Sequence, residues 1–532
     1  MASDAPKGLM DVDGRLQEKV ELSDADAPSA QMSWSRAGSI GPAMIVVVLC
    51  VVATYVVPAL SFARPWRPGE PVPFWNVIGR PFEGDAAADK KAREEEIDEV
   101  ADEVIAADET EPPPPKPKAK PVVKAKAGDV VPVYVAQDGD DAKVVQSIEL
   151  FAGDELDAFF AQLARTDAGL EGAITHVGHW GDSVIGMDGI PGAIRRRMQN
   201  RFGDGGHGFH LMAPPNTSYL HREVKFSHNG GWSNCFIIQN CRKDGFYGLG
   251  GATFKSSAGG ESSFAPHPER SSGHVSHFEL FYAGQPGGGT LRLRLDRDKA
   301  SDVTIDTEAE ALVDRFHRID VEDGYHELEV RASGGKVRVF GVAMETDGPG
   351  VVWDSYALVG AFTKRMSNYS EDHLRAQLGH RGTDLAVFTF GGNDMIRNIT
   401  MDTYIAEYRE VVSKFRRARP EMSCLIMSPL DHGVRKGVRI ETLPIVPQMV
   451  EAQRTVAREE GCAFFDTWAA MGGEGSAGRW YKKDPRLMGG DLGHATGKGH
   501  QVIGEFVQRA VVEAYVAYRK RTDGTPNAPK KE

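Results

Sequence analysis

The stretch from residue 173 to residue 202 limits most strongly what fold this chain can adopt. Its apolar beginning is typical of a buried strand, and the apolar run stops at Gly181-Asp182-Ser183. After Pro191, apolar residues recur at helical spacing, namely Ile194, Met198 and Phe202. Ser183 is therefore predicted on a turn between the carboxyl end of a strand and a helix. A hydroxyl at such a turn is exposed, and the helix N-terminus favours negative charge beside it.

Three later stretches have a related form and follow in a fixed order. Residues 351–361 run from an apolar strand to Gly360, and residues 384–394 run from a strand to Asn393. Residues 491–500 contain Asp491-Leu492-Gly493-His494 ahead of the final helix. Together with the first stretch, they resemble the four sequence blocks of the SGNH, or GDSL-type, hydrolase family. The resemblance covers roughly residues 170–216 and 348–520.

This resemblance implies a fold and a set of catalytic residues. The fold is α/β, a flavodoxin-like parallel sheet between two layers of helices. The catalytic triad would be Ser183 with Asp491 and His494. The oxyanion hole would be formed by Ser183, Gly360 and Asn393. No cofactor and no metal ion are expected.

The alternation of strands and helices along the chain agrees with this fold class. Apolar strand-like segments lie near Ile174, Val352, Leu385, Cys424 and Ala463. Segments of helical periodicity lie between or after them, at residues 401–417, 446–460 and 499–519. Such a pattern predicts a parallel sheet covered on both faces, with the active site at the carboxyl ends of the strands.

The residue types at these positions suit nucleophilic ester hydrolysis. Serine needs a base to remove its proton during attack, and histidine, with an unperturbed pKa of ~6.5, suits this task. Asp491 can hold the other ring nitrogen of His494 and stabilise the imidazolium. Gly360 lets the backbone approach the ester closely, and the Asn393 amide supplies an N–H without charge. These roles predict a two-step route through acylated Ser183.

Other polar residues are given structural interpretations. The pair Asp431-His432 is an alternative base, but it lacks the Asp-x-x-His spacing. His500 lies inside the predicted final helix and is expected to be structural. His176 and His179 are expected to be buried and hydrogen-bonded, although one of them could line the pocket. A group in a Gly-rich loop lacks a fourth ligand for a metal site: Asp204, His207 and His210.

Between the first two blocks, residues 218–347 have a different character and interrupt the predicted hydrolase domain (146–217 and 348–520). Short strand-like segments and Gly-rich turns predict an inserted β-sandwich of jelly-roll type. The predicted strands are residues 224–226, 235–238, 277–282, 291–295, 303–305, 316–321, 326–330 and 336–342. Peptidoglycan O-acetylesterases of the same family are similar in this respect, which implies a carbohydrate-binding role. Three aromatic residues could stack on sugars but are more simply explained as core: Trp232, Phe246 and Tyr247.

The N-terminal residues lack the pattern of a folded domain. Residues 1–39 are polar and are predicted to be a disordered tail, as are residues 521–532. Residues 40–62 are apolar and uncharged, which predicts a retained transmembrane signal anchor. Residues 63–145, first acidic and then rich in proline and lysine, are predicted to be a linker with a solvated helix or coil in its acidic part.

The predicted anchor bears on where the protein acts. One N-terminal anchor before a large domain favours a single-pass protein of the inner membrane, with its catalytic domain in the periplasm or outside. The flanking arginines slightly favour the opposite orientation, because Arg36 precedes the anchor and Arg64 and Arg67 follow it. A net charge of −13 argues against a nucleic-acid partner.

The five cysteines are too few to be a disulfide framework. Cys424 and Cys462 are predicted to be small hydrophobic residues of buried strands. Cys235 and Cys241 are close enough in sequence to bridge across a hairpin in an oxidising compartment, and free thiols are the equal alternative.

These features together predict a membrane-anchored serine esterase that removes O-acetyl groups from an envelope polysaccharide. Peptidoglycan is the substrate that the resemblance favours. Another acetylated polysaccharide, a lipid ester, or acyl transfer to a sugar hydroxyl are the alternatives within enzyme chemistry. The alternative outside it is an anchored glycan-binding protein that has lost activity. The presence of all five required residue types argues against that last alternative.

Overall fold

The computed structural model describes residues 84–110, 122, 131–257 and 259–523. The predicted tail (1–39) and anchor (40–62) lie outside these residues, as do residues 63–83, 111–121, 123–130 and 524–532. No helix within the described part of the chain combines the length and the apolar character needed to cross a membrane. Residues 89–532 form one unit, and its described part is the subject of the following paragraphs.

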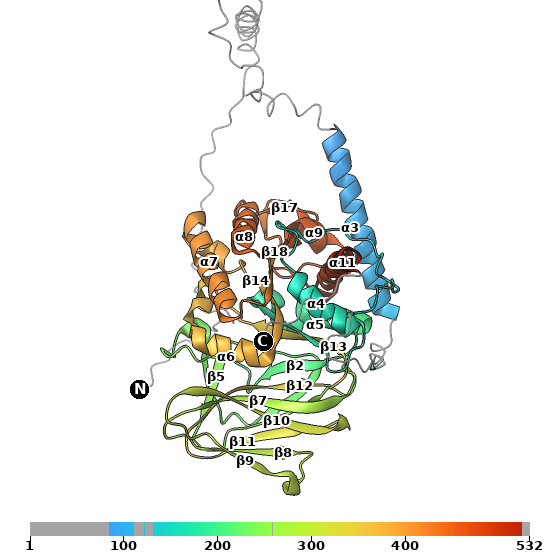
Figure 1. The fold of residues 1–532 in the computed structure, drawn as a ribbon. Coiled ribbons are helices and arrows are strands. Elements are labelled where there is room, and N and C mark those ends of the chain that lie inside the picture. Colours follow the sequence, from blue (N-terminus) through green and yellow to red (C-terminus); the bar gives the residue numbers. More distant parts are fainter. Residues whose placement is uncertain (1–83, 111–121, 123–130, 258, 524–532) are drawn as a thin grey trace, which may run out of the picture. The chain divides into compact units, whose positions relative to one another are not determined.

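A five-stranded parallel sheet organises one half of this unit (Figure 1). Its strands are, in spatial order, β13 (Gly350–Ala357), β1 (Ile174–Gly181), β14 (Thr383–Thr389), β15 (Ser423–Met427) and β18 (Ala463–Phe465). All neighbouring pairs run parallel. The five strands are those predicted from the apolar segments, and their order places β1, with the catalytic serine candidate after it, in the interior of the sheet.

Helices cover both faces of this sheet because alternate side chains of its buried strands point to opposite sides. In β14, Leu385 and Val387 pack on one face, and Ala386 and Phe388 pack on the other. The first face is covered by α4 (Asp157–Asp167), α5 (Ile190–Phe202) and α11 (Gly497–Thr522). The second face is covered by α6 (Glu371–Arg381), α7 (Met401–Ala418) and α8 (Val446–Glu460). The shorter α9 (Thr467–Ala470) and α10 (Ser476–Lys482) precede the last helix.

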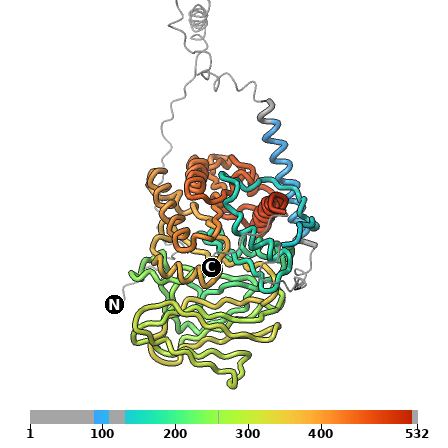
Figure 2. The backbone as a smooth tube through the Cα atoms, in the orientation of Figure 1, coloured from blue at the N-terminus to red at the C-terminus, as the bar shows by residue number. Residues whose placement is uncertain are grey.

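Two antiparallel sheets form the other half of the unit, and Figure 2 shows the chain passing into them and back. The first contains β10 (Val313–Gly324), β7 (Val275–Gly284), β12 (Val337–Glu345), β5 (Ala252–Ser256) and β4 (Ser233–Phe236), with β2 (Gly206–Leu211) also paired to β12. The second contains β3 (Val224–His228), β6 (Glu261–Pro266), β11 (Leu328–Gly334), β8 (Thr290–Leu295) and β9 (Val303–Asp306). His210 of the first sheet stacks on Phe226 of the second, with ring centroids 4.4 Å apart.

This β-sandwich begins earlier than the predicted boundary at residue 218. Strand β2 precedes that boundary, yet it pairs with β12 near the end of the insertion. The three aromatic residues considered for sugar binding belong to the interior, as expected. Trp232 and Tyr247 are buried, and Phe246 stacks on His373 with ring centroids 4.4 Å apart.

The predicted linker differs most from the structure. Helix α3 spans Gly84–Thr110, and its apolar residues are buried against the face of the sheet that carries α4 and α11: Ile97, Val100, Ala101, Val104 and Ile105. Residues 131–145 also pack on the domain, since the ring of Tyr134 meets that of Tyr515 at 6.5 Å. A stretch dominated by acidic residues therefore forms part of the folded unit.

Cysteine pairing also differs from the expectation. Cys424 of β15 is bonded to Cys462, the residue before β18, whereas both were predicted to be unpaired core residues. These two residues are buried neighbours because β15 and β18 are adjacent strands. Cys235 and Cys241 are also bonded, which is the first of the two alternatives left open by the sequence.

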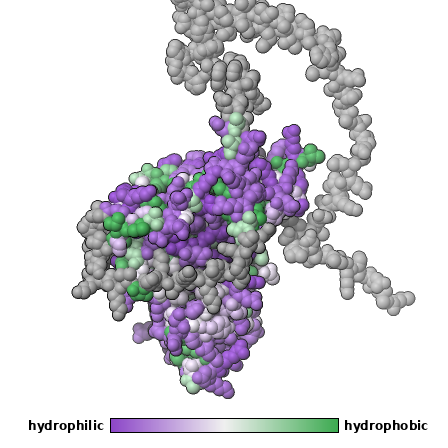
Figure 3. Space-filling view, turned by 90° about the vertical axis from the view of Figure 1, so that its right-hand side faces the viewer, coloured by the Kyte–Doolittle hydropathy of each residue, from purple (hydrophilic) through white to green (hydrophobic). Residues whose placement is uncertain are grey.

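The described surface is mainly hydrophilic on the face seen in Figure 3.

Candidate active site

The parallel register places three loops at one edge of the sheet. Gly181, at the end of β1, lies beside Ala357 of β13 and Thr389 of β14. Ser183 follows Gly181 by two residues, Gly360 follows Ala357 by three, and Asn393 follows Thr389 by four. Because parallel strands end at a common edge, these three residues lie at the same end of the sheet.

The turn that carries Ser183 is shaped by its neighbours. Ser183 begins the short 3-10 segment η4 (Ser183–Asp188), and the Asp182 carboxylate accepts a hydrogen bond from the Val184 N–H at 3.0 Å. A side chain at Gly181 would meet the Thr389 carbonyl oxygen, with Cβ only 2.6 Å from it, so the close approach of β1 and β14 requires glycine. Asp182 is fully buried, and burial raises its pKa to about 6.

The structure brings the side chains of Ser183, His494 and Asp491 into one hydrogen-bonded chain. The Ser183 Oγ lies 2.8 Å from His494 Nε2, and His494 Nδ1 lies 2.7 Å from Asp491 Oδ2. A carboxylate can only accept, so Nδ1 carries the proton and Nε2 is free to accept the serine proton. The side chains of His494 and Asp491 are 47% and 56% exposed, so solvent reaches both of them.

The loop that holds Asp491 and His494 is braced by its own hydrogen bonds. Asp491 Oδ1 accepts from the N–H groups of Gly493 and His494, both at 3.2 Å. Gly489 donates its N–H to the His494 carbonyl at 2.8 Å. Partial burial alone would raise the pKa of Asp491, but the hydrogen bonds from His494 and Gly493 lower it overall. The carboxylate therefore stays ionised beside the imidazole.

Gly360 and Asn393 occupy neighbouring loops beyond the strands. Gly360 has φ +82°, a backbone conformation that favours glycine, and its N–H makes no hydrogen bond within the described part of the chain. The Asn393 Nδ2 donates to the Ala361 carbonyl at 3.2 Å, which ties Asn393 to the Gly360 loop and leaves a second N–H on the same amide. Asp394 strengthens this connection by accepting from the N–H and hydroxyl of Thr363.

The alternative acid–base pair is not formed. Asp431 accepts from the Ala477 N–H at 2.7 Å and from the Thr442 hydroxyl at 3.0 Å. His432 donates from Nδ1 to the Leu430 carbonyl at 3.0 Å instead of binding Asp431. The ring of His432 nevertheless borders the candidate site, because its Cδ2 lies 3.0 Å from the position that a Cβ on Gly493 would occupy. The sequence offered His432 only as part of an alternative base pair, and the structure places its ring beside the site without that pairing.

The remaining histidines have structural surroundings. His176 contacts Glu345 at 3.2 Å, and His179 contacts the Thr389 hydroxyl at 2.8 Å. Burial lowers the pKa of His500 to about 4 and that of His210 to about 3. Among the residues that the structure describes, no group of histidine, cysteine or acidic side chains is arranged to hold a metal ion.

Comparison with known proteins connects this geometry to a family. Residues 330–502 match the family model described as GDSL-like lipase/acylhydrolase. The matched segment includes Gly360, Asn393, Asp491 and His494, whereas Ser183 lies before the inserted sandwich. No curated protein matches the chain in sequence.

Solved structures resemble this chain to different degrees. A peptidoglycan O-acetylesterase is 19% identical, with a TM-score of 0.59 over 70% of this chain and 99% of that chain. A family two carbohydrate esterase from Clostridium thermocellum is 12% identical over 56% of this chain and 100% of that chain, with a TM-score of 0.22. An esterase from Pseudoalteromonas sp. is 12% identical over 30% and 76%, with a TM-score of 0.23. The first of these three shows that both halves of the unit occur together in another protein.

Proposed function

We propose that this esterase of the SGNH/GDSL type removes O-acetyl groups from a polysaccharide of the cell envelope, with peptidoglycan as the favoured polymer. The observation that carries the proposal is the hydrogen-bonded chain from Ser183 through His494 to Asp491 at the open edge of the sheet. The peptidoglycan O-acetylesterase of similar fold supports the choice of polymer.

In the proposed mechanism each of these residues has one step. His494 Nε2 takes the proton of Ser183 while Oγ attacks the acetyl carbonyl carbon, and Asp491 stabilises the resulting imidazolium. The same proton then passes to the sugar oxygen as the C–O bond to the acetyl group breaks. Water, deprotonated by His494, attacks acetyl-Ser183, and His494 returns that proton to Oγ as the bond to the acetyl group breaks and acetate leaves. In both steps the N–H groups of Ser183, Gly360 and Asn393 stabilise the oxyanion, and losing one such donor typically costs ~3–4 kcal/mol.

The test is acetate release by the full chain, compared with Ser183→Ala and with the exposed-serine control Ser227→Ala. The substrates are O-acetylated peptidoglycan, acetylated xylan and p-nitrophenyl acetate. We expect Ser183→Ala to reduce release from peptidoglycan by at least about a thousandfold and Ser227→Ala to leave it unchanged. If acetylated xylan is preferred, xylan rather than peptidoglycan is the substrate. If the folded wild-type chain turns over none of the three esters, the esterase proposal is refuted.

We further propose that the catalytic unit lies outside the cytoplasmic membrane, anchored through residues 40–62. Support comes from the pairs Cys424–Cys462 and Cys235–Cys241, because disulfides persist in oxidising compartments and are rare in the cytosol. Labelling of unreduced, denatured protein from cells with a maleimide should modify Cys50 alone. Modification of Cys424 before reduction would contradict this location.

A further inference from the structure

Two arginines lie against one tyrosine next to the candidate active site. Arg435 belongs to β16 (Gly433–Lys436), which forms a hairpin with β17 (Arg439–Thr442), and its guanidinium carbon is 4.8 Å from the centre of the Tyr481 ring. The guanidinium carbon of Arg486 is 4.5 Å from the same centre. Both arginines are exposed, and Tyr481 is partly exposed. We call Arg435, Tyr481 and Arg486 the Arg-Tyr-Arg cluster.

The cluster is fixed in place by its surroundings. The hairpin pairs over four positions, from Gly433 opposite Thr442 to Lys436 opposite Arg439. Ile440 of the hairpin packs close to Gly478 of α10, where a Cβ would lie 3.1 Å from the Ile440 Cβ. Tyr481 belongs to the same helix, so the arginine on the hairpin and the tyrosine on the helix keep their relative positions. A guanidinium held on an aromatic face loses less freedom when it binds a ligand.

The cations of this cluster have no acidic partner. Within the described residues, no carboxylate oxygen lies within 4.0 Å of Arg435, Arg486 or the nearby Arg439, in contrast to Arg454, which contacts three carboxylates. The side-chain hydrogen bond from Arg435 and the charge of Arg486 lower the pKa of Tyr481. On a chain with a net charge of −13, these two exposed guanidinium groups are free of carboxylates and available to an anionic ligand.

The cluster is joined directly to the loop that carries Asp491 and His494. The Gly433 N–H donates to the Leu492 carbonyl at 2.8 Å, and Leu492 lies between those two residues. On the other side, the Thr496 hydroxyl donates to the Arg486 carbonyl at 2.6 Å. Figure 1 shows β17 at the end of the hydrolase half that points away from the sandwich. The chain segments that carry Arg435 and Arg486 are therefore held against the two sides of the catalytic loop.

We propose that the Arg-Tyr-Arg cluster is a substrate subsite that binds a carboxylate of the acetylated polysaccharide, and this rests on the proposed esterase function. Guanidinium groups bind carboxylates through paired N–H donors, a geometry that favours them over neutral hydroxyls. The subsite favours polymers with carboxylates on their sugars or on attached peptides, and it discriminates against neutral polymers such as xylan. The hydrogen bonds that join the segments of the cluster to the catalytic loop favour a glycan over an anionic membrane surface as its ligand.

The test compares two forms of one substrate. O-acetylated peptidoglycan fragments are used with their carboxylates free or converted to amides, which removes charge but keeps the acetyl ester. For the wild-type chain we expect amidation to raise KM roughly tenfold and to leave kcat unchanged, the size expected for two exposed charge-assisted contacts. The double variant Arg435→Gln/Arg486→Gln should lose this difference and show the high KM with both substrates. Arg439→Gln, which removes a charge from the same hairpin away from Tyr481, should behave as wild type.

The outcomes separate the subsite from the esterase function. All variants should hydrolyse p-nitrophenyl acetate equally, and failure of the wild-type chain with this ester would refute the function itself. Normal turnover of that ester without any effect of amidation on KM would refute the subsite alone. An Arg439→Gln variant as impaired as the double variant would also refute it, since general charge would then suffice. Loss of binding to phosphatidylglycerol vesicles with an unchanged KM ratio would assign the cluster to lipid headgroups and overturn the proposal. If the double variant unfolds, Arg435→Gln on the exposed hairpin replaces it.

Discussion

Asp182 shows how a residue that braces the serine turn also limits stability. Its carboxylate is fully buried next to Ser183, and burial, with a further contribution from nearby Asp394, raises its pKa from 3.8 to about 6. The folded chain therefore holds this proton more tightly than the unfolded chain does. The resulting contribution to stability is fully present below pH 3.8 and is lost as the pH rises through about 6. The buried charge is the form present at neutral pH.

We expect Asp182→Asn to relieve this cost while keeping an oxygen for the Val184 N–H. Relative to wild type, the variant should gain up to about 3 kcal/mol in free energy of unfolding above pH 6, and nothing below pH 4. Urea unfolding of both proteins between pH 4 and 8 measures this difference. A constant difference across that range would show that Asp182 is not protonated preferentially in the folded chain.

The site residues differ in how far the sequence could reveal them. Ser183, Asp491 and His494 belong to short local patterns, and the structure places their side chains within hydrogen-bonding distance of one another. The sequence offered His432 only as half of an alternative base pair that does not form, and it gave no indication of Arg435. Their proximity to the catalytic loop comes from the contact of Gly433 with Leu492, residues far apart in sequence that no spacing rule connects.

At the scale of elements, regular apolar periodicity predicted helices and strands better than composition did. The predicted helices 401–417 and 446–460 correspond to α7 (Met401–Ala418) and α8 (Val446–Glu460). The predicted strands of the insertion all overlap observed strands, whereas β2, β5 and β6 were missed. Strand β2 was missed because its sequence, Gly-His-Gly-Phe-His-Leu, has none of the alternation or β-branched residues that indicate strands. All of its residues are nevertheless buried.

Helix α3 was interpreted from its acidity, although its buried residues recur at helical spacing from Ile97 to Ile105. Its acidic residues do not all face water. Glu94 pairs with Arg479 at 2.9 Å, and Asp102 pairs with Lys483 at 2.9 Å, both from the region of α10. Charge and apolar contacts therefore attach the helix to the hydrolase half, and a charge run alone could not distinguish this from a solvated helix.

We expect Val100→Asp to detach α3. Val100 is 1% exposed, and burying a carboxylate there is more costly than releasing the helix. The free energy of unfolding should fall by about 2 kcal/mol or more, the value of one buried valine. Limited proteolysis should then cut within residues 84–110, as followed by mass spectrometry. Ala92→Asp adds the same charge at an exposed position of the helix and should leave both properties unchanged; equal sensitivity of the two variants would contradict the docking.

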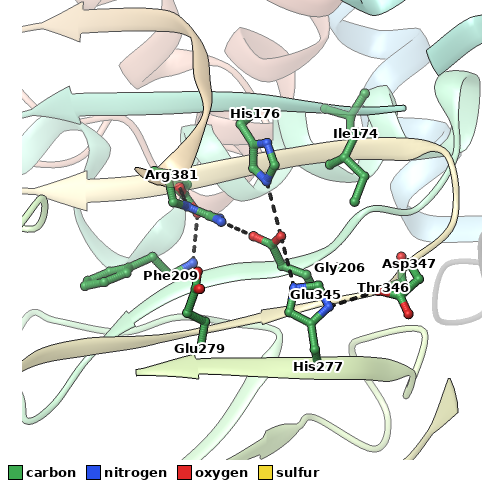
Figure 4. A network of polar contacts seen from close by, with 12 residues as sticks. Ile174, His176, Gly206, Phe209, His277, Glu279, Glu345, Thr346, Asp347 and Arg381 are labelled. Atoms are coloured by element: carbon green, nitrogen blue, oxygen red, sulfur yellow. Dashed lines mark hydrogen bonds and ion pairs between the residues drawn. The ribbon is translucent and has the colours of Figure 1, made fainter. Parts of the chain in front are cut away.

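At the scale of the whole unit, a buried ion network joins the hydrolase half to the sandwich (Figure 4). Arg381, at the end of α6, donates to Asp354 of β13 from two nitrogens at 2.9 and 3.0 Å and also binds Glu345 at the end of β12. His176 of β1 and His277 of β7 contact the same glutamate at 3.2 and 3.6 Å. Burial opposes ionisation of Glu345, but Arg381 and the histidines hold its pKa well below the ordinary range. The insertion is thus attached to the parallel sheet by charge as well as by apolar packing, such as that of Phe209 on Tyr356.

Removing the arginine should show how much this junction depends on charge. Arg381→Met leaves the carboxylates of Asp354 and Glu345 buried without their cation, and breaking such a pair typically costs about 3–5 kcal/mol. In the wild-type chain, the low pKa of Glu345 means that its ionised form stabilises the fold above pH 4.5, and this stabilisation is lost as the pH falls. In the variant, the unpaired carboxylate favours protonation instead. The deficit of the variant should therefore be largest near pH 8 and shrink towards pH 5, as measured by urea unfolding.

Arg375→Met, on the exposed face of the same helix beside Glu371, should cost less than about 1 kcal/mol at either pH. A deficit for Arg381→Met no larger than that of Arg375→Met would mean that apolar packing, such as that of Phe209 of β2 on Tyr356 of β13, holds the two halves together without help from the network.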